Sequence, residues 1–403
     1  MQLPTPIRTL AIALTTSIFA GACGGDPGGP ATATVAGLVK AADGTVIAGA
    51  TVRIGTVTAT TGANGRFELM NVPIGTATIR TTAADFDPRS ESVSLTAGTN
   101  THDVVLTRGE WGARAALLEA NSEFGLAESN GKLYVIGGYP ASRVTVRTVQ
   151  IYDIASDRWQ LGPQLPEPNN HGMAAAVNGK IYLIGGQLTA DQEGYVDTVY
   201  ELDPAVGAWV EKARMPTMRS GGVAVVHAGK IYVAGGRVPR GNDFAVYDPA
   251  TDLWEVLPDL PTQRNHITGV AINGRIHIVG GRLGNGLSPL KTTAHEVFDP
   301  LTRTWTTAAA MLSGRSGING VMARGCFHVW GGEAPTGMTP QHEYYDPRTN
   351  EWGSLRDMPI PIHGVVGSAF VDGVIWVTGG GTHIGGSSGS LHNQTYRPEV
   401  SCE

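Results

Sequence analysis

Arginine, histidine and carboxylate side chains recur at fixed distances from six Gly-Gly pairs in this 403-residue chain. Sixteen residues before the pairs stand Asn121, Asn169, Arg219, Arg264, Arg315 and His363. Fourteen residues before them stand Glu123, His171, Gly221, His266, Gly317 and Val365. Directly after them stand Tyr139, Gln187, Arg237, Arg282, Glu333 and Gly381. Because guanidinium groups bind carboxylates and phosphates through paired hydrogen bonds, the five arginines predict a cationic site for an acidic ligand.

The same residues have other interpretations. The arginines could brace neighbouring segments instead of binding a ligand, and the sequence leaves both roles open. His171, His266 and His363 have the residue type of a metal trio. They belong to the second, fourth and sixth segments, however, and we expect no metal or other cofactor. The sequence also lacks the Gly-x-Ser-x-Gly, phosphate-loop and His-Glu-x-x-His motifs of three common enzyme classes.

The elements that must position these side chains follow from a repeat of 45 to 51 residues. Each Gly-Gly pair ends an apolar run such as LYVIGG, IYLIGG or IWVTGG, and in five segments an Asp precedes a Trp by six residues, as Asp153 precedes Trp159. Turn residues such as Asn178-Gly179 separate the short runs, which predicts four strands per segment joined by tight hairpins. One such unit cannot bury both of its faces, so the array must close on itself.

The two ends of the array complement each other. The last segment holds Gly379-Gly380 and Tyr396 but ends before a Trp strand, while Trp111 stands 26 residues before Gly137, the usual interval. We therefore expect the strand near Trp111 to complete the sixth unit. Closure of this kind removes free sheet edges.

These markers resemble the kelch repeat, whose signature is a Gly-Gly pair, a Tyr-Asp pair and a Trp. The resemblance covers residues 109–398, with departures where Phe298 replaces the Tyr and where Leu202 precedes Asp203. It implies an all-β fold, a six-bladed kelch β-propeller with strands A to D counted outward from the axis. The D–A and B–C loops of such a ring would surround an axial mouth, where function is expected.

The resemblance also implies a binding mode. In kelch domains that bind acidic peptides, arginines of an Arg-Ser-Gly loop contact the ligand, and Arg219-Ser220-Gly221 and Arg315-Ser316-Gly317 match that loop. We expect a non-enzymatic binding or scaffold protein whose mouth takes a carbohydrate, an acidic ligand or a protein segment. The expected binding residues are Arg219, Arg264, Arg315, Arg237, Arg282, Asn121, Asn169, His171, His266 and His363.

An enzymatic alternative stays open, because six-bladed bacterial kelch proteins include enzymes that interconvert sialic acid anomers. The resemblance implies arginines around a carboxylate with an acidic residue beside them. Ring opening of a hemiacetal needs a positioned acid or base, and Glu333 or Glu123 would supply it. The copper-radical chemistry of kelch galactose oxidases is not expected, because Cys326 is predicted on the face opposite the mouth.

Residues 31–107 lack the repeat and alternate apolar with polar side chains, which favours a small β-sandwich. Three successive patterns resemble the carboxypeptidase regulatory-like domain: Gly49-Ala50-x-Val52, Gly65-x-Phe67 and Val72-Pro73-x-Gly75. The resemblance implies a fold similar to carbohydrate-binding sandwiches. It carries no metal ligands of a peptidase, so we expect a spacer or a weak ligand-binding module.

Residues 1–22 resemble a bacterial lipoprotein signal peptide. Arg8 precedes an apolar run too short to span a bilayer, and Cys23 would be lipidated, with residues 23–30 as a Gly/Pro-rich tether. Ala20 departs from the usual Leu, so an ordinary secretory peptide is the alternative. The resemblance implies a bacterial cell envelope protein, anchored through lipid alone at the outer membrane, facing the periplasm or the surface. The net charge is −6 and no Lys/Arg cluster occurs, so no nucleic-acid partner is expected.

Two further cysteines remain, Cys326 and Cys402. An export compartment permits a disulfide. The predicted topology brings the tail, residues 399–403, to the face where Cys326 begins its strand. We expect a bond between them, with two unpaired thiols as the alternative.

Overall fold

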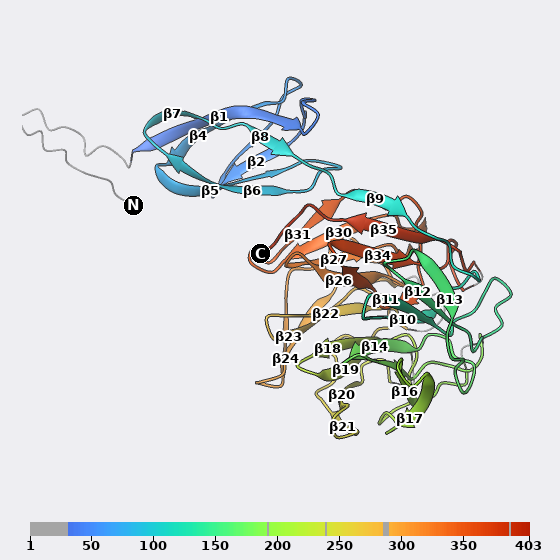
Figure 1. Ribbon diagram of the computed structural model, residues 1–403. Coiled ribbons are helices and arrows are strands. Elements are labelled where there is room, and N and C mark those ends of the chain that lie inside the picture. The colour runs from blue at the N-terminus through green and yellow to red at the C-terminus, as the bar shows by residue number, and fades with distance from the viewer. Residues whose placement is uncertain (1–30, 192, 238–239, 285–289, 387) are drawn as a thin grey trace, which may run out of the picture.

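The computed structural model describes residues 31–191, 193–237, 240–284, 290–386 and 388–403. Its regular elements in these ranges are all β-strands, arranged as a small sandwich beside a larger ring (Figure 1). The predicted fold class is therefore confirmed. The predicted signal peptide, Cys23 and the tether lie outside the described residues. A search of the described residues for a helix long and apolar enough to cross a membrane finds none.

The sandwich places two sheets around one apolar core. One sheet has the order β4-β1-β7 with β8 also paired to β1, and the other has the order β3-β2-β5-β6. Along the first strand every second side chain is buried, which is the alternation that a half-buried strand requires. The strands are β1 (Thr32–Ala41), β2 (Thr51–Ile54), β3 (Val57–Thr60), β4 (Arg66–Pro73), β5 (Gly75–Thr82), β6 (Arg89–Leu95), β7 (Gly98–Thr101) and β8 (Val104–Leu106).

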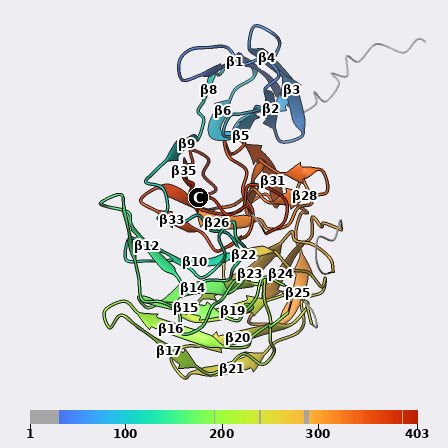
Figure 2. The ribbon, with the colours of Figure 1, turned by 90° about the vertical axis from the view of Figure 1, so that its right-hand side faces the viewer.

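The ring contains six blades of four antiparallel strands within the described ranges, and the short strand β32 adds to the first of them in parallel (Figure 2). Blades 1 to 3 consist of β10 (Phe124–Ser129), β11 (Lys132–Ile136), β12 (Val149–Asp153), β13 (Arg158–Leu161), β14 (Met173–Val177), β15 (Lys180–Ile184), β16 (Val199–Asp203), β17 (Ala208–Lys212), β18 (Val223–His227), β19 (Lys230–Ala234), β20 (Phe244–Asp248) and β21 (Leu253–Val256).

Blades 4 and 5 consist of β22 (Thr268–Ile272), β23 (Arg275–Val279), β24 (His295–Asp299), β25 (Thr304–Thr307), β26 (Asn319–Ala323), β27 (Cys326–Trp330), β30 (His342–Asp346) and β31 (Glu351–Leu355). A short hairpin of β28 (Glu333–Ala334) and β29 (Gly337–Met338) extends from blade 5. Blade 6 consists of β33 (Ala369–Val371), β34 (Val374–Thr378), β35 (Asn393–Arg397) and β9 (Glu110–Ala113), while β32 (Val365–Val366) pairs with β10.

Blade 6 joins the two ends of the repeat array. Its outer strand β9 pairs antiparallel with β35, with Trp111 opposite Tyr396. The ring is therefore closed by one strand from before the first blade and three from the end of the chain. The tail beyond β35 returns to blade 5, where Cys402 forms a disulfide with Cys326.

The repeated tryptophans connect each blade to the one before it. In every blade the outer-strand indole N–H donates to a backbone carbonyl that follows the outer strand of the preceding blade, at 2.7–3.1 Å. Such an indole fills the wedge between blades and satisfies its one polar group. The bonds run from Trp159 to Ala115, Trp209 to Pro163, Trp254 to Ala213, Trp305 to Pro258, Trp352 to Ala309 and Trp111 to Arg356.

Candidate site at the axial mouth

A closed ring of backbone hydrogen bonds surrounds the axis at the start of the innermost strands. Each blade contributes one residue with a left-handed backbone, at φ between 54° and 68°. Each of these residues donates its N–H to the carbonyl of its counterpart in the preceding blade, and Glu123 donates to the last of them, Gly364. The axial ring consists of Glu123, His171, Gly221, His266, Gly317 and Gly364.

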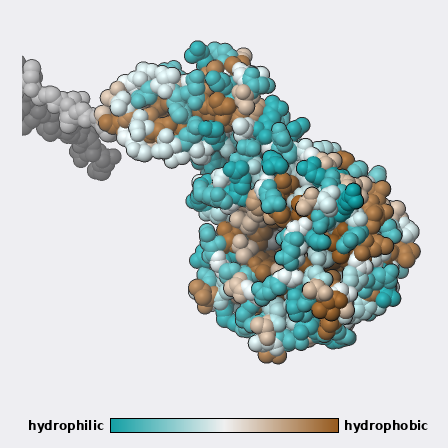
Figure 3. Space-filling view, viewed as in Figure 1, coloured by the Kyte–Doolittle hydropathy of each residue, from teal (hydrophilic) through white to brown (hydrophobic). Residues whose placement is uncertain are grey.

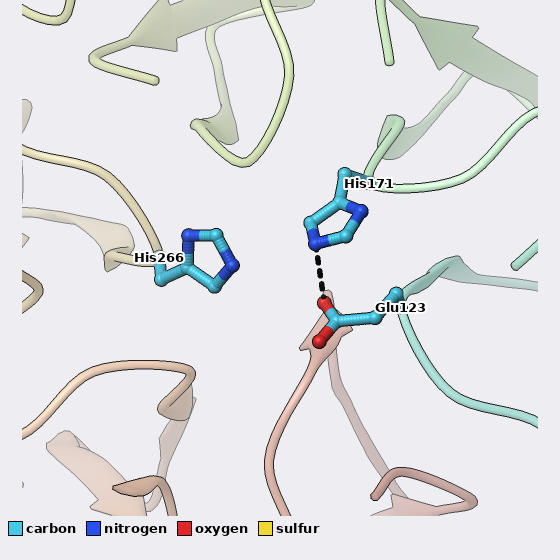
Figure 4. A group of neighbouring side chains, drawn as sticks. All are labelled: Glu123, His171 and His266. Atoms are coloured by element: carbon cyan, nitrogen blue, oxygen red, sulfur yellow. Dashed lines mark ion pairs between the residues drawn. The ribbon is translucent and has the colours of Figure 1, made fainter. Parts of the chain in front are cut away.

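Only half of this axial ring is glycine, although every member has the conformation that favours it. Glu123, His171 and His266 adopt φ of 54°, 54° and 56°. A non-glycine residue in this region costs on the order of 1 kcal/mol or more, and such strain concentrates at functional sites. The glycines provide space for the other side chains, because an added Cβ at Gly364 would lie 2.5 Å from Glu123 Oε1. The ring therefore carries three side chains that meet at the axis (Figure 4).

The structure corrects the predicted alignment of blade 6. Counting back from the Gly-Gly pair placed Val365 in the axial ring, but the residue there is Gly364. His363 therefore corresponds to Asn170 and Asn265, not to the arginines. The extra residue lies between β32 and β33, where Gly367 adopts φ 124° and an added Cβ would lie 2.0 Å from the Leu126 carbonyl oxygen. The innermost strand is interrupted there.

Two asparagines orient the two axial imidazoles. Asn170 Oδ1 lies 2.5 Å from His171 Nδ1, and Asn265 Oδ1 lies 2.7 Å from His266 Nδ1. The amide nitrogens of both asparagines donate to backbone carbonyls, so their oxygens face the rings. Each imidazole thus donates from Nδ1 and turns Nε2 toward the axis. Sequence reasoning missed this role, although the Asn-His pair occurs in both blades.

Two arginines meet the axial imidazoles. Arg237 Nη2 donates to His171 Nε2 at 3.0 Å and lies 3.4 Å from His266 Nε2. Arg282 Nη2 donates to His266 Nε2 at 2.8 Å, and its Nη1 donates to Glu333 Oε1 at 2.8 Å. Both arginines follow the Gly-Gly pairs, as predicted, and both are almost fully buried.

These groups border a cavity of about 190 Å³ at the mouth. Four of the predicted residues line it together with both predicted carboxylates, and Tyr139 adds a buried phenol that the binding prediction omitted. The lining residues are Glu123, Tyr139, Arg143, Ala190, Arg237, His266, Arg282, Gly317, Glu333, His363, Gly385 and Gly386.

Charge at the axis is unevenly distributed. Burial raises the pKa of Glu123, but His171, His363 and Arg237 outweigh it and hold this pKa well below its usual range. Burial and then Arg237 lower the pKa of His171 to about 4, against the opposing effect of Glu123. Burial and the two arginines also hold the pKa of His266 well below its usual range. Near neutral pH we thus assign an ionised Glu123 between two neutral imidazoles.

His171 Nε2 has two incompatible neighbours. It accepts from Arg237 when it is unprotonated, yet it lies 2.9 Å from Glu123 Oε2, which can only accept. The contact with Glu123 becomes a hydrogen bond only when His171 gains a proton. Glu123 thus favours the protonated imidazole, whereas burial and Arg237 favour the neutral one. Burial has the largest effect, so the neutral form of His171 is favoured. Near neutral pH this nitrogen therefore accepts from Arg237.

Among the described residues, Glu123, His171 and His266 form the group that could hold a metal ion, because their ligand atoms lie within 4.8 Å of one another. This trio differs from the one considered in the sequence, since His363 Nε2 donates to the Gly385 carbonyl instead. Arg237 and Arg282 already occupy the Nε2 lone pairs of both imidazoles. A divalent cation would have to displace two guanidinium groups, so the arrangement favours arginine over metal.

The other predicted arginines are not at the mouth. Arg219, Arg264 and Arg315 are at most 1% exposed and lie inside their own blades. Arg264 pairs with Glu296 and Arg315 with Glu343, while Arg219 Nη1 donates to the Asp243 carbonyl at 2.7 Å. These contacts fit the bracing interpretation, within a blade and not between neighbours.

Asn121 and Asn169 also have structural contacts. Their amide nitrogens donate to the carbonyls of Gly137 and Gly185, at 2.7 and 2.9 Å. Of the ten predicted binding residues, the structure brings Arg237, Arg282, His171, His266 and His363 to the mouth, and places the other five within the blades.

Family comparisons agree with this architecture. A model described as the KLHDC2/KLHL20/DRC7 Kelch-repeats domain matches residues 118–281, and a Kelch motif model matches residues 263–312. A model of the carboxypeptidase regulatory-like domain matches residues 34–107.

Relatives and solved structures match in part. Kelch-like protein 36 of Mus musculus is 47% identical over 58 residues, which is 14% of this chain and 10% of that protein. Kelch-like protein 7 of Rattus norvegicus is 36% identical over 104 residues, 26% of this chain and 17% of that protein. The chain therefore spans a small part of these curated relatives. A solved structure titled "Structure of YjhT" matches with a TM-score of 0.59 and 16% identity, covering 69% of this chain and 95% of that one, which shows a shared fold.

Proposed function

The chain carries kelch repeats and a carboxypeptidase regulatory-like domain, and from this premise we propose that it is a binding protein whose propeller mouth takes an acidic ligand. The ligand is a carbohydrate acid or the acidic group of a protein segment. One observation carries the proposal: three of six positions that favour glycine hold Glu123, His171 and His266 instead. Strain of that kind persists where the side chains are needed.

Arg237 is the group best suited to receive the ligand. Its side-chain partners are the neutral Gln187, His171 and His266, and its Nε has no hydrogen-bond partner among the described residues. A buried donor without a partner is costly, and a carboxylate oxygen would satisfy it. Arg282, by contrast, already has an ion pair with Glu333.

Binding can be tested by proton NMR with the purified protein and a panel of neutral sugars, sugar acids and short acidic peptides. We expect line broadening for acids and none for their neutral analogues, and loss of the broadening in Arg237→Ala. Arg214→Ala, an exposed arginine of blade 2, is the control. The proposal would be refuted if the lines of neutral and acidic ligands broadened equally. It would also be refuted if Arg237→Ala broadened the lines of an acidic ligand as much as the native protein does.

A sugar-acid mutarotase is the second candidate. It is supported by the meeting of Glu333, Arg282 and Glu123 at one cavity, with His171 Nε2 2.9 Å from Glu123 Oε2. Mutarotation requires a base to take the proton of the anomeric hydroxyl and an acid to protonate the ring oxygen. The same NMR spectra test it: exchange between anomer signals should accelerate for one acidic sugar, and the Glu123→Gln variant should lose that acceleration.

Location in the bacterial envelope is also a proposal, supported by the Cys23 sequence context and by a disulfide of the kind that exported proteins form. We expect the native chain to incorporate labelled fatty acid and the Cys23→Ser variant to incorporate none. If export does not require lipidation, both proteins should be found in the envelope fraction. A cytoplasmic native chain would contradict the proposal.

A further inference from the structure

The sandwich contacts the propeller through a buried carboxylate. Asp87, between β5 and β6 of the sandwich, is 3% exposed. Its oxygens accept hydrogen bonds from Tyr396 Oη at 3.1 Å and from the backbone N–H groups of Glu399 and Val400 at 2.8 and 3.2 Å. Tyr396 belongs to β35, whereas Glu399 and Val400 belong to the tail that follows it. Asp87 thus binds blade 6 and the tail together.

The other contacts between the two domains are weaker. Arg53 and Arg80 each lie 3.4 Å from Glu351 Oε2, and the Arg53 and Glu351 side chains are more than 40% exposed. The exposed pair of Arg53 with Glu351 contributes about 0–1 kcal/mol, and the Arg80 side chain is 16% exposed. Arg80 also donates to Tyr344 Oη at 2.9 Å. The junction therefore depends most on the buried Asp87.

No apolar core compensates for this polar junction in the described part of the chain. The buried cluster of the sandwich lies within residues 33–106, and the clusters of the propeller begin at Leu117. In the space-filling view hydrophilic residues gather where the domains meet (Figure 3). Domains joined by a polar interface move relative to each other unless specific contacts hold them.

The tail that supplies two of the donors to Asp87 is fastened to blade 5. Cys402 is bonded to Cys326 of β27, and its N–H donates to the Arg324 carbonyl at 2.8 Å. The Arg348 guanidinium donates to the Glu403 carbonyl at 2.6 Å. Arg324 Nη1 also donates to the Pro398 carbonyl at 3.2 Å, and the Val400 side chain is buried in a core cluster of the propeller. The Glu399 and Val400 N–H groups are therefore held from both sides, and the disulfide is the one covalent contact.

We propose that the Cys326–Cys402 disulfide is a redox-sensitive clamp that holds the sandwich on the propeller. A dithiol reductant breaks the S–S bond by supplying two electrons and two protons, so that two thiols form and the reductant becomes a disulfide. The released tail removes two N–H donors from Asp87. A buried carboxylate that loses donors is strongly disfavoured, so Asp87 leaves the interface for water.

The electrostatics of Asp87 agree with this dependence. Burial raises the pKa of Asp87, and the hydrogen bonds from Glu399, Tyr396, Gly109 and Val400 oppose that rise. The tail therefore supplies two of the four hydrogen bonds that stabilise the buried charge. Ring closure does not depend on them, because β9 pairs with β35 before the tail begins. Reduction should loosen the sandwich and leave the ring closed.

Pulsed electron resonance between two nitroxide labels tests the clamp. The labels are placed on Met70→Cys in the sandwich and Leu391→Cys in blade 6, both exposed, in the full chain carrying Cys23→Ser. We expect a narrow distance distribution with the disulfide intact, and one about twofold broader in the Cys326→Ser/Cys402→Ser background, because a polar interface then lacks its anchor. A distribution that stays equally narrow would overturn the proposal.

Asp87→Ala separates the clamp from a general loss of structure, because it keeps the disulfide. It should broaden the distribution to the same extent, whereas Asp43→Ala, whose carboxylate bonds Thr45 within the sandwich, should leave it narrow. If Asp87→Ala broadened the distance distribution and the double cysteine variant did not, the interface would not depend on the disulfide, and the proposal would be rejected.

Should the cysteine pair variant fail to fold, reduction of the folded protein gives the second measurement. Dithiothreitol should accelerate tryptic cleavage after Arg108, in the linker whose Gly109 packs against Tyr396, while the near-ultraviolet tryptophan signal of the ring is retained. An unchanged cleavage rate after complete reduction, verified by thiol titration, would refute the clamp.

Discussion

Blade 4 contains two buried arginines with glutamate partners that have opposite consequences. Arg264 pairs with Glu296 of β24, and its two Nη groups also donate to the Thr262 and Ile278 carbonyls, while its Nε has no partner among the described residues. Arg282 pairs with Glu333 of the next blade, and its Nη2 donates a hydrogen bond to His266 at the axis. The first pair fills the interior of a blade, and the second borders the cavity.

The comparison shows that burial and pairing do not by themselves identify a binding residue. What separates the two arginines is where their remaining donors point: to backbone carbonyls of the same blade, or to side chains held in a strained ring. An arginine that braces a blade and one that borders the mouth thus both pair with a buried glutamate, and substitutions distinguish the two roles.

The largest expected effect is in the brace. Arg264→Ala leaves Glu296 charged, buried and unpaired, which should cost about 3–5 kcal/mol of unfolding free energy, measured by urea denaturation. Arg275→Ala is the control, because that exposed arginine lies 3.2 Å from Asp299 and an exposed pair contributes about 0–1 kcal/mol. Similar losses in both variants would mean that Arg264 is not a brace.

At the mouth, affinity should change more than stability. Arg237→Ala should weaken binding of the tightest acid of the panel about 10- to 100-fold, since a hydrogen bond to a charged group contributes about 1.5–3 kcal/mol, as measured by calorimetry. Its partners are neutral groups that water in the cavity can satisfy. Arg240→Ala, an exposed arginine from the same loop, should bind normally. If Arg237→Ala instead lowers the unfolding free energy and leaves the affinity unchanged, Arg237 is a brace and not a binding residue.

The axial ring can be tested without removing any charge. Gly364→Ala should cost about 2 kcal/mol, because the positive φ is strained and its Cβ displaces Glu123, and it should weaken ligand binding. Gly229→Ala has a similar φ with open space around it, so it should cost only about 1 kcal/mol and leave binding unchanged. If Gly364→Ala and Gly229→Ala had equal effects on ligand binding, Glu123 would not belong to the binding site.

The last effect, which appears only as the pH is lowered, concerns a histidine inside blade 4. Burial lowers the pKa of His295 from 6.5 to about 4. Between pH 6.5 and about 4 the unfolded chain binds a proton at His295 that the folded chain does not bind. The free energy of unfolding is therefore greatest above pH 6.5 and falls as the pH drops toward 4. His295→Gln should reduce this slope by about 1.4 kcal/mol per pH unit, measured by urea denaturation at several pH values. An unchanged slope would mean that His295 is charged in the fold.

The sequence predicted the blades well because their markers are tied to repeated local needs, such as the indole that bonds the preceding blade. It misplaced His363 because one residue was inserted into the innermost strand of blade 6. The interval from Trp352 to Gly379, 27 residues where others have 26, was the available sign.

The direction of the loop arginines was harder to predict. Arg264 and Arg315 turn inward because β24 and β30 each carry a buried glutamate, Glu296 and Glu343. A glutamate in the middle of an apolar strand signals such a partner. Asp87 gave no local signal, because its partners lie at the other end of the chain.

Closure of blade 6 by β9 has a consequence for biosynthesis. Residues 110–113 leave the ribosome long before residues 393–397, with which they pair. Blades 1 to 5 consist of consecutive strands and can assemble as the chain lengthens, but the sixth must wait until residues 393–397 have been made. Until then the nascent ring has two open edges, which are the places where chaperones are needed and where premature truncation leaves a chain prone to aggregate.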